Sequence, residues 1–394
     1  MIRGNASSAW GPDLLPIGLV LSYGALVQLI AARHGAASQI TWTLYLPYAL
    51  PAMLAVASAG LAILSVQALR RHPELPLVSG LRLELSRLDM DAVALLRSLA
   101  LLTLLPVFLS LFSSFKVLIP LLHPFEWDSN LAELDRVLHG GVDPWRHLQP
   151  LLDQPAAIRL LDFLYHPIWS LTLLALWTWQ SMDRRRPDLR LQMLLAVPLV
   201  WILVGSIAGT VFSSAGPCYF AEVGGAPDRF GPLLEQLAAI DAEAPLMSQS
   251  AQQMLWELHR ARSLGLGGGI SAMPSVHVAS AFLVVLLARR YGRTALVIAF
   301  AYFLFMLVGS VALGWHYAVD AYAGIVLSCP VWMGCGAVAR RLWNPEHAAS
   351  ASLGLPSFSS SRDIAAEAAE TLTSLDQRSH CQTSEVGPAF SSRG

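Results

Sequence analysis

The sequence predicts an all-helical membrane protein with about eight transmembrane helices. Charged residues make up 13% of the 394-residue chain, which is about half of the ~25% found in typical globular domains. Apolar residues make up 55% of the chain, and its mean hydropathy is +0.52. A soluble protein could not hide that much apolar surface, whereas helices in a lipid bilayer have no need to hide it.

Eight apolar stretches come close to the ~20 residues that cross a bilayer as a helix. In chain order they are 12–33, 42–69, 93–122, 160–182, 191–213, 274–289, 294–314 and 316–339. The first is interpreted as a span and not as a secretory signal, because no basic segment and small-residue cleavage site bracket a short apolar core. Prolines interrupt several of the spans, which packed membrane helices tolerate.

Arginines collect in alternate loops, and this pattern predicts the orientation of the chain. One basic cluster follows each even-numbered span, at Arg70–Arg71, Arg184–Arg186, Arg289–Arg290 and Arg340–Arg341. Since cytoplasmic loops retain positive charge, we expect both termini in the cytoplasm. The loops 123–159 and 214–273 then lie on the outer side.

The segments between and after the spans differ in character. The outer loop 123–159 carries tryptophans and leucines among its charges, which predicts short helices in the membrane interface. The loop 214–273 contains an amphipathic stretch at 244–263. Residues 344–394 are dominated by Ala, Ser, Glu and Thr and cannot bury enough apolar surface to fold, so we expect a disordered cytoplasmic tail.

Charge and cysteine content exclude several classes of partner. The formal net charge of −1 lacks the basic balance of nucleic-acid-binding proteins, so no nucleic acid is expected. The four cysteines show neither a C-x-x-C pair nor zinc-ligand spacing, so no metal is predicted. The sequence also gives no sign of an obligatory protein partner.

The first candidate for chemistry is the segment S-A-M-P-S-V-H, which ends at His277. Pro274 suits the first position of a helix, so His277 should lie in the first turn of the sixth span. The helix N-terminus and the preceding glycines offer unpaired N–H groups to an anion such as phosphate, which makes Ser275 and Gly269 candidate substrate-binding residues. A flexible turn is the favoured alternative for the run Gly267–Gly269. Taken alone, His277 would more often be a packed histidine.

The second candidate is the segment G-W-H-Y-A-V-D, which ends at Asp320. His316 and Asp320 are four residues apart and therefore share one helix face. A carboxylate that accepts from one imidazole nitrogen fixes the tautomer and leaves the other nitrogen free to attack. With His277 opposite, the site would have a nucleophile, an orienting acid and a proton donor, and it would require no metal or other cofactor. The alternative for Asp320 is a first-turn acid that complements the helix dipole.

These two segments resemble the P-S-G-H and S-R-x5-H-x3-D motifs of the type 2 phosphatidic acid phosphatase superfamily. Within it, A-M-P-S-V-H and G-W-H-Y-A-V-D resemble the inositol phosphorylceramide synthase-like branch of inositolphosphotransferases. The resemblance covers roughly 93–340. It implies a six-helix phosphatase-like catalytic core at 93–343, preceded by two extra N-terminal helices and a cytoplasmic loop at 1–92.

The resemblance also implies a role for each of the three residues. His316 would be the phosphohistidine nucleophile and Asp320 its partner. His277 would protonate the leaving oxygen and then activate the acceptor hydroxyl or a water molecule.

The chain departs from the superfamily at its phosphate-binding cations. The superfamily motif K-x6-R-P would place Gly209 at its lysine and Gly216 at its arginine. The motif S-R-x5-H-x3-D would place Ser310 at its arginine. A phosphoryl transition state spreads negative charge over three oxygens and needs positive donors. Other residues must therefore supply them.

Arg260 and Arg262 are the first candidates for this role, and Lys116, the single lysine, is the next. The alternative for the two arginines is contact with lipid headgroups. Tyr219 is expected at the substrate headgroup. Three residues at the outer start of the fourth span are interpreted as packing or interface anchors: Tyr165, His166 and Trp169.

The expected function is the cleavage of a lipid phosphate ester through a covalent histidine, with a membrane phospholipid as substrate. The phosphoryl group, or a phosphoryl-headgroup unit, passes to a lipid or polyol acceptor. The favoured version is a phosphotransferase for an inositol-phosphate or similar headgroup, and the close alternative is a phosphatase for phosphatidic acid or a polyprenyl diphosphate. A transporter is less favoured, because no inverted repeat is found and both histidines lie at span ends.

The expected location is the inner membrane of a bacterium, with the active site on the periplasmic or outer face. A composition rich in arginine with one lysine indicates a GC-rich bacterial source. The face follows from the arginine distribution, because both histidines fall at the outer ends of their spans.

Overall fold

The computed structural model describes residues 11–86, 92–183, 185–225 and 229–343. The tail predicted at 344–394 lies outside the described residues. Two compact units divide the chain after Ala339, and the helical bundle belongs to the first of them. Every regular element among the described residues is a helix, as the composition predicts, and none is a strand.

Seven helical segments are long and apolar enough to cross a membrane. They are formed by α1 (Gly11–Arg33), α2 (Leu46–Arg71), α4 (Ala92–Leu122), α8 to α9 (Pro155–Met182), α10 to α11 (Pro187–Val211), α15 (Arg293–Ala312) and α16 (Ala318–Trp343). The remaining predicted span, 274–289, is α14 (Val276–Ala288), an apolar helix of 13 residues. The multi-pass, all-helical prediction is therefore confirmed, with one helix shorter than the ~20 residues of a full crossing.

Two of the crossing segments change their winding part of the way along. A π-helical turn, Leu164–Ile168, joins α8 (Pro155–Phe163) to α9 (Trp169–Met182). A second one, Trp201–Ala208, joins α10 (Pro187–Val200) to α11 (Gly209–Val211). Such turns are rare in helices and are frequent at functional sites.

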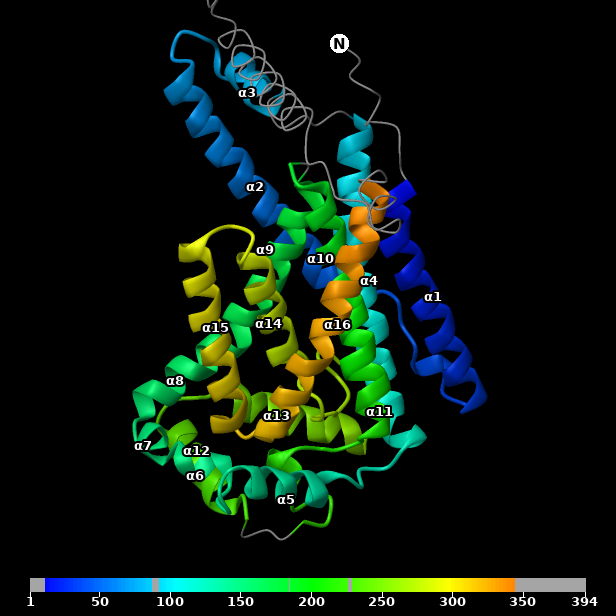
Figure 1. Cartoon of the computed structure of the whole chain (residues 1–394), viewed down its shortest axis with the longest axis vertical. Helices are drawn as coiled ribbons and strands as arrows, with labels where there is room; N and C mark the ends of the chain where they lie inside the picture. The colour runs from blue at the N-terminus through cyan, green and yellow to red at the C-terminus, as the bar shows by residue number, and fades with distance from the viewer. Residues whose placement is uncertain (1–10, 87–91, 184, 226–228, 344–394) are drawn as a thin grey trace, which may run out of the picture. The chain divides into compact units, whose positions relative to one another are not determined.

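Short helices gather at one end of the bundle (Figure 1). They are α5 (Asp128–Leu138), α6 (Pro144–His147), α7 (Gln149–Leu152), α12 (Gly231–Glu243) and α13 (Met247–Arg260). The sequence predicts short helices in the loop 123–159 and an amphipathic stretch at 244–263 in the loop 214–273, and helices form in both loops. The remaining elements are α3 (Leu77–Ser86) and the 3₁₀ turns Ala37–Gln39 and Pro217–Tyr219.

A buried ionic cluster joins α1, α4 and α10 at the opposite end of the bundle. The carboxylate of Asp13 accepts hydrogen bonds from Arg97 through one oxygen and from Arg190 through the other, the latter at 2.7 Å. Arg190 also donates to the carbonyl oxygens of Gln180 and Ser181. All three charged side chains are at most 5% exposed. Their pairing matters because a buried charge without a partner is costly.

Candidate active site

His316 and Asp320 meet where α16 begins. The Nδ1 atom of His316 lies 3.3 Å from Oδ2 of Asp320, and the Tyr317 N–H donates to the same oxygen at 3.0 Å. Asp320 is completely buried. When Nδ1–H donates to the carboxylate, the Nε2 atom of His316 keeps its lone pair, and no described residue bonds to it. This is the arrangement that an attacking imidazole requires.

His277 lies in the first turn of α14 and faces His316. The two ring centroids are 6.2 Å apart, too far for a direct hydrogen bond. The ring of Tyr165 stacks on His277 at 4.9 Å, and that of Trp169 lies 4.1 Å from it. The imidazole makes no hydrogen bond to any described residue, so its nitrogens are available to a ligand.

Ser275 ties the start of α14, which carries His277, to the start of α16, which His316 directly precedes. Its Oγ accepts from the Val278 N–H at 3.3 Å and so caps α14, while its own N–H donates to the Asp320 carbonyl at 2.9 Å. On α16, a Cβ atom at Gly324 would stand 2.7 Å from the Ser275 carbonyl oxygen, so only glycine allows this close approach. The side chain of Ser275 is used for capping, and its substrate-binding role stays a prediction.

Two buried aspartates on α5 hold the loops of the site, and the sequence analysis did not single them out. Asp135 accepts from the Ala318 and Val319 N–H groups at 2.9 and 3.0 Å, which caps α16. Asp128 accepts from Ala215 and Gly216 N–H, both at 2.8 Å, and from the Tyr317 hydroxyl at 2.9 Å. Burial raises the pKa of both carboxyl groups, against the lowering effect of these hydrogen bonds. Their partners lie 87 to 189 positions away in the chain, so no local pattern could reveal them.

The two histidines line one cavity of about 230 Å³. Its other polar lining residues include Lys116, Tyr165, His166, Tyr219, Ser271 and Trp315. Four of their buried polar atoms have no hydrogen-bond partner among the described residues: Tyr165 Oη, His166 Nε2, Ser271 Oγ and Trp315 Nε1. Buried polar groups are normally paired. A cluster of unpaired ones around a cavity suits a ligand rich in acceptor oxygens.

His166 forms a second carboxylate–imidazole pair in the same cavity. Its Nδ1 atom lies 3.2 Å from an oxygen of Asp162, four positions earlier in the chain. The same Asp162 carboxylate accepts from the Met247 and Ser248 N–H groups at 2.7 and 2.9 Å. The sequence predicts a packing role for His166, and in the structure this residue also lines the cavity of the histidines.

The remaining predicted substrate-binding residues lie in two places. Tyr219 and Gly269 line the cavity of the histidines, and the Tyr219 hydroxyl already donates to the Gln252 carbonyl at 2.7 Å. Gly269 has φ +83°, and a Cβ atom there would stand 2.3 Å from Cβ of Lys116. This glycine is thus required for close packing against α4, an explanation that differs from both a flexible turn and a phosphate cradle.

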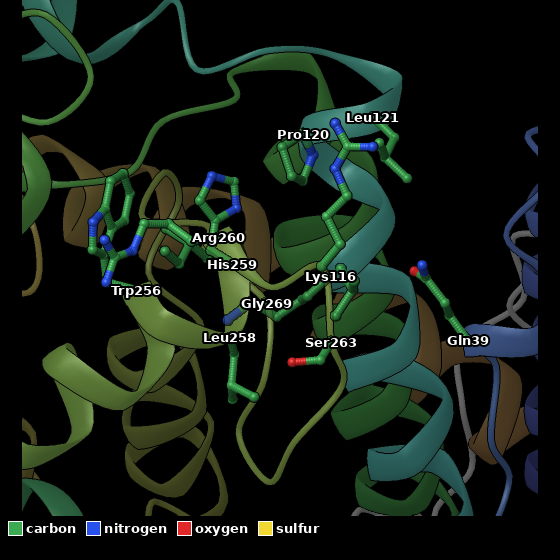
Figure 2. Close-up of a pocket in the computed structure, with 13 residues that line it drawn as sticks. Gln39, Lys116, Pro120, Leu121, Trp256, Leu258, His259, Arg260, Ser263 and Gly269 are labelled. Carbon is green, nitrogen blue, oxygen red and sulfur yellow. The ribbon is translucent and has the colours of Figure 1, made fainter.

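Arg260 and Arg262 line an adjoining cavity of about 290 Å³. Lys116, Gly269 and Ile270 contribute to the walls of both cavities. In Figure 2, Lys116 projects from α4 beside Gly269. Of the three predicted cations, Lys116 therefore lines the cavity of the histidines, and the two arginines line the adjoining cavity of about 290 Å³.

A third cavity, of about 510 Å³, is largely apolar and reaches the site from between α2, α4 and α9. Its lining includes Tyr48, Leu105, Leu109, Phe112, Leu173 and Trp201. It meets the cavity of the histidines at five residues that line both: Lys116, Leu266, Gly267, Val276 and His277. All of the helices concerned are among the apolar membrane-crossing segments.

A family model described as the PAP2 superfamily matches residues 129–333, which is more than half of the chain. The chain belongs to the PAP2 superfamily. The matched segment contains both histidines and Asp320, whereas Lys116 and all of α1, α2 and α4 precede it. It begins later than the core predicted at 93–343. No curated protein and no solved structure matches the chain.

Membership of the superfamily makes the protein an enzyme of the phosphatase or phosphotransferase kind. The helices make it a multi-pass membrane protein. It is therefore a lipid phosphatase or phosphotransferase in the broad sense, and the specific reaction is a separate question.

Proposed function

We propose that this chain is a lipid phosphotransferase that works through a phosphohistidine at His316. The observation that carries the proposal is the geometry of three residues. Asp320 holds one nitrogen of His316, the other nitrogen is unpartnered among the described residues, and His277 stands across the same cavity. A nucleophile with an orienting carboxylate and an opposed proton donor is the combination that phosphoryl transfer through a covalent intermediate requires.

The reaction would proceed in two steps. Nε2 of His316 attacks phosphorus, the bond from phosphorus to the lipid oxygen breaks, and protonated His277 donates its proton to that oxygen. In the second step, neutral His277 takes the proton of an acceptor hydroxyl. The acceptor oxygen then attacks phosphorus, the phosphorus–nitrogen bond breaks, and both histidines return to their starting states.

The negative charge of the phosphoryl oxygens would be stabilised by Lys116 together with hydrogen-bond donors. Tyr165, Ser271 and Trp315 each present a donor without a partner among the described residues. In its protonated form, His166 would present an Nε2–H group as well. Preorganised donors in a cavity that excludes water can stabilise a transition state strongly. This set would take the place of the superfamily cations that Gly209, Gly216 and Ser310 replace.

The substrate is proposed to be a membrane phospholipid with an inositol-phosphate or similar headgroup. The largely apolar cavity between α2, α4 and α9 suits a hydrocarbon chain, because it reaches His277 from membrane-crossing helices. The headgroup proposal rests on the segments A-M-P-S-V-H and G-W-H-Y-A-V-D. A lipid or polyol hydroxyl is the proposed acceptor, and water is the alternative acceptor that would make the enzyme a phosphatase.

The proposed location is the inner membrane of a bacterium, with the cavity on the periplasmic or outer face. Support for this orientation comes from the arginine clusters that follow alternate spans. No obligatory protein partner is proposed.

The experiment follows phosphorus from a labelled phospholipid in membranes that contain the full-length protein, the His316→Ala variant or the control His147→Ala. His147 is an exposed histidine on α6 that lines none of the three cavities. Transfer predicts a new labelled lipid that depends on His316, together with labelled protein that is stable in base and labile in acid. His316-dependent release of a water-soluble phosphate, the headgroup phosphate from a phosphodiester or inorganic phosphate from a monoester, would replace transfer by hydrolysis. Label that moves equally in all three proteins would refute the proposal.

A further inference from the structure

The cavity beside the catalytic one is lined by basic side chains. Lys116 on α4 and His259, Arg260 and Arg262 at the end of α13 all line its volume of about 290 Å³. No aspartate or glutamate is part of this lining. Figure 2 shows the wall of α4 on one side, with Lys116, Pro120 and Leu121, and the end of α13 on the other. A concave site with this charge favours an anion.

The arginines of this cavity lack the acidic partners that other arginines at this end of the bundle have. Arg136 pairs with Glu133, Arg159 with Glu243 and Arg229 with Asp143, at 2.6 to 3.1 Å. Among the described residues, no carboxylate lies within ion-pair distance of Arg260 or Arg262. Within the described part of the chain, the positive charge of the two arginines is therefore not neutralised by a carboxylate.

Arg262 also occupies a backbone position at which glycine is the usual residue. The helix α13 ends in a Schellman turn, in which Ser263 N–H donates to the Leu258 carbonyl at 3.0 Å and Arg262 N–H to the His259 carbonyl at 3.1 Å. The residue at this turn adopts a left-handed conformation, and Arg262 does so with φ +50°. Within the described ranges, it is the single residue other than glycine with positive φ. A non-glycine residue in this conformation is uncommon and is more often found at functional sites, which singles out the Arg262 side chain.

We infer that this basic cavity binds a second phosphate-bearing group, next to the one that reacts at His316. The inference builds on the proposed function in one respect, namely that the neighbouring cavity holds a phosphoryl group. Lys116, in the wall common to both cavities, lies between the two anions and balances their repulsion. The second phosphate belongs either to the reacting lipid itself, as in a diphosphate, or to the headgroup of a separate anionic lipid.

Binding without turnover tests this inference. The full-length His316→Ala protein is placed in bilayers of phosphatidylcholine, and the affinity and stoichiometry of two probes are measured, phosphatidic acid and diacylglycerol pyrophosphate. The measurement is repeated with Arg260→Gln/Arg262→Gln and with Arg262→Gly added. Glycine relieves the left-handed conformation, so Arg262→Gly should keep or raise thermal stability. It should nevertheless weaken binding, since a charge-assisted hydrogen bond contributes about tenfold in affinity.

The two sources of the second phosphate give different results. If it belongs to the substrate, the double variant lowers the affinity for the pyrophosphate lipid at least about tenfold and leaves phosphatidic acid unchanged. If it belongs to a separate lipid, the bound phosphatidic acid falls from two equivalents to one. The control Arg146→Gln removes an exposed arginine that stacks on Trp145 outside the cavity, and it should change neither quantity.

Unchanged affinity and stoichiometry in both the double variant and Arg262→Gly would overturn the inference. A second outcome would also overturn the inference. In it, the double variant binds more weakly and loses thermal stability, while Arg262→Gly binds fully, so the weaker binding comes from a folding defect. Since no turnover is measured, failure of the proposed phosphotransfer does not affect the result. A protein without His316-dependent chemistry could still bind two phosphate groups. A protein with that chemistry could equally bind only one.

Discussion

The helix α4 carries one basic residue toward each of its ends, and the two have opposite surroundings. Arg97 is buried against Asp13, which also binds Arg190 from α10. Lys116, 19 positions and therefore ~28 Å further along the helix, has no acidic partner among the described residues and lines three cavities. Charges that neutralise one another serve the fold, whereas a charge that faces cavities is available to a ligand. The comparison separates the structural end of the bundle from its catalytic end.

The largest effect is expected at the catalytic end. His316→Ala removes the proposed nucleophile, so turnover of a labelled phospholipid should fall by a factor of about 10³ or more. Thermal stability in detergent should change little, because the imidazole makes a single hydrogen bond to Asp320. A large loss of stability with partial activity would instead assign His316 to the structural end of the comparison.

The next effect is expected at the structural end. Asp13→Asn removes the carboxylate charge that pairs with Arg97 and Arg190 and should lower the free energy of unfolding by about 3–5 kcal/mol. The activity of each folded molecule should stay the same, because the cluster is remote from the histidines. Glu133→Gln, which breaks an exposed pair with Arg136, is the control and should change stability little. Equal effects of both variants would contradict the distinction.

Lys116→Gln sharpens the comparison, since it removes the other charge of α4. Activity should fall about 10²-fold, the cost of one stabilising donor in a transition state. Thermal stability should stay unchanged or rise, because a charge without a counter-ion in the fold is lost. Measured side by side with Asp13→Asn, it should show the reverse order of activity loss and stability loss. A destabilised Lys116→Gln protein with full activity would show that the charge serves the fold.

The smallest effect is expected from two tyrosines of the catalytic cavity. Tyr165→Phe removes a hydroxyl without a partner among the described residues, so activity should fall about tenfold while stability is unchanged or higher. Tyr219→Phe is the matched variant, because its hydroxyl donates to the Gln252 carbonyl. It should cost about 1 kcal/mol of stability and little activity. The opposite result would support the predicted contact of Tyr219 with the substrate headgroup.

The local part of the site is predictable from sequence, because its residues are close together in the chain. His316 and Asp320 are four positions apart in the chain and lie close to each other and to His277. The predicted shared helix face is wrong, because α16 begins only at Ala318 and His316 lies in the turn before it. The supporting carboxylates Asp128 and Asp135 could not be found in this way. They bind N–H groups of loops that are far away in sequence, and nothing in α5 itself distinguishes them from surface acids.

The helix boundaries likewise depend partly on local sequence and partly on contacts that are distant in the chain. The predicted start at residue 160 is five residues late, since the helix begins at Pro155, where a proline suits the first turn. The predicted start at residue 42 is early, because Tyr45 N–H donates to Ser110 Oγ on α4 and the helix starts only at Leu46. Apolar composition finds each helix, whereas contacts with other helices decide where it ends. The position of Lys116 in the wall shared by two cavities, only one of which Arg260 lines, is likewise a tertiary property.

A primary amine is a rare group in this protein. Lys116 is the single lysine of the 394 residues, so it is the one side chain in this sequence that offers an amine to an amine-selective reagent. The same side chain lines all three cavities. Its rate of acylation should therefore fall when a ligand occupies any one of them. A small reagent could thus report, from one modified position, when a lipid chain, a phosphate or an inhibitor occupies the interior.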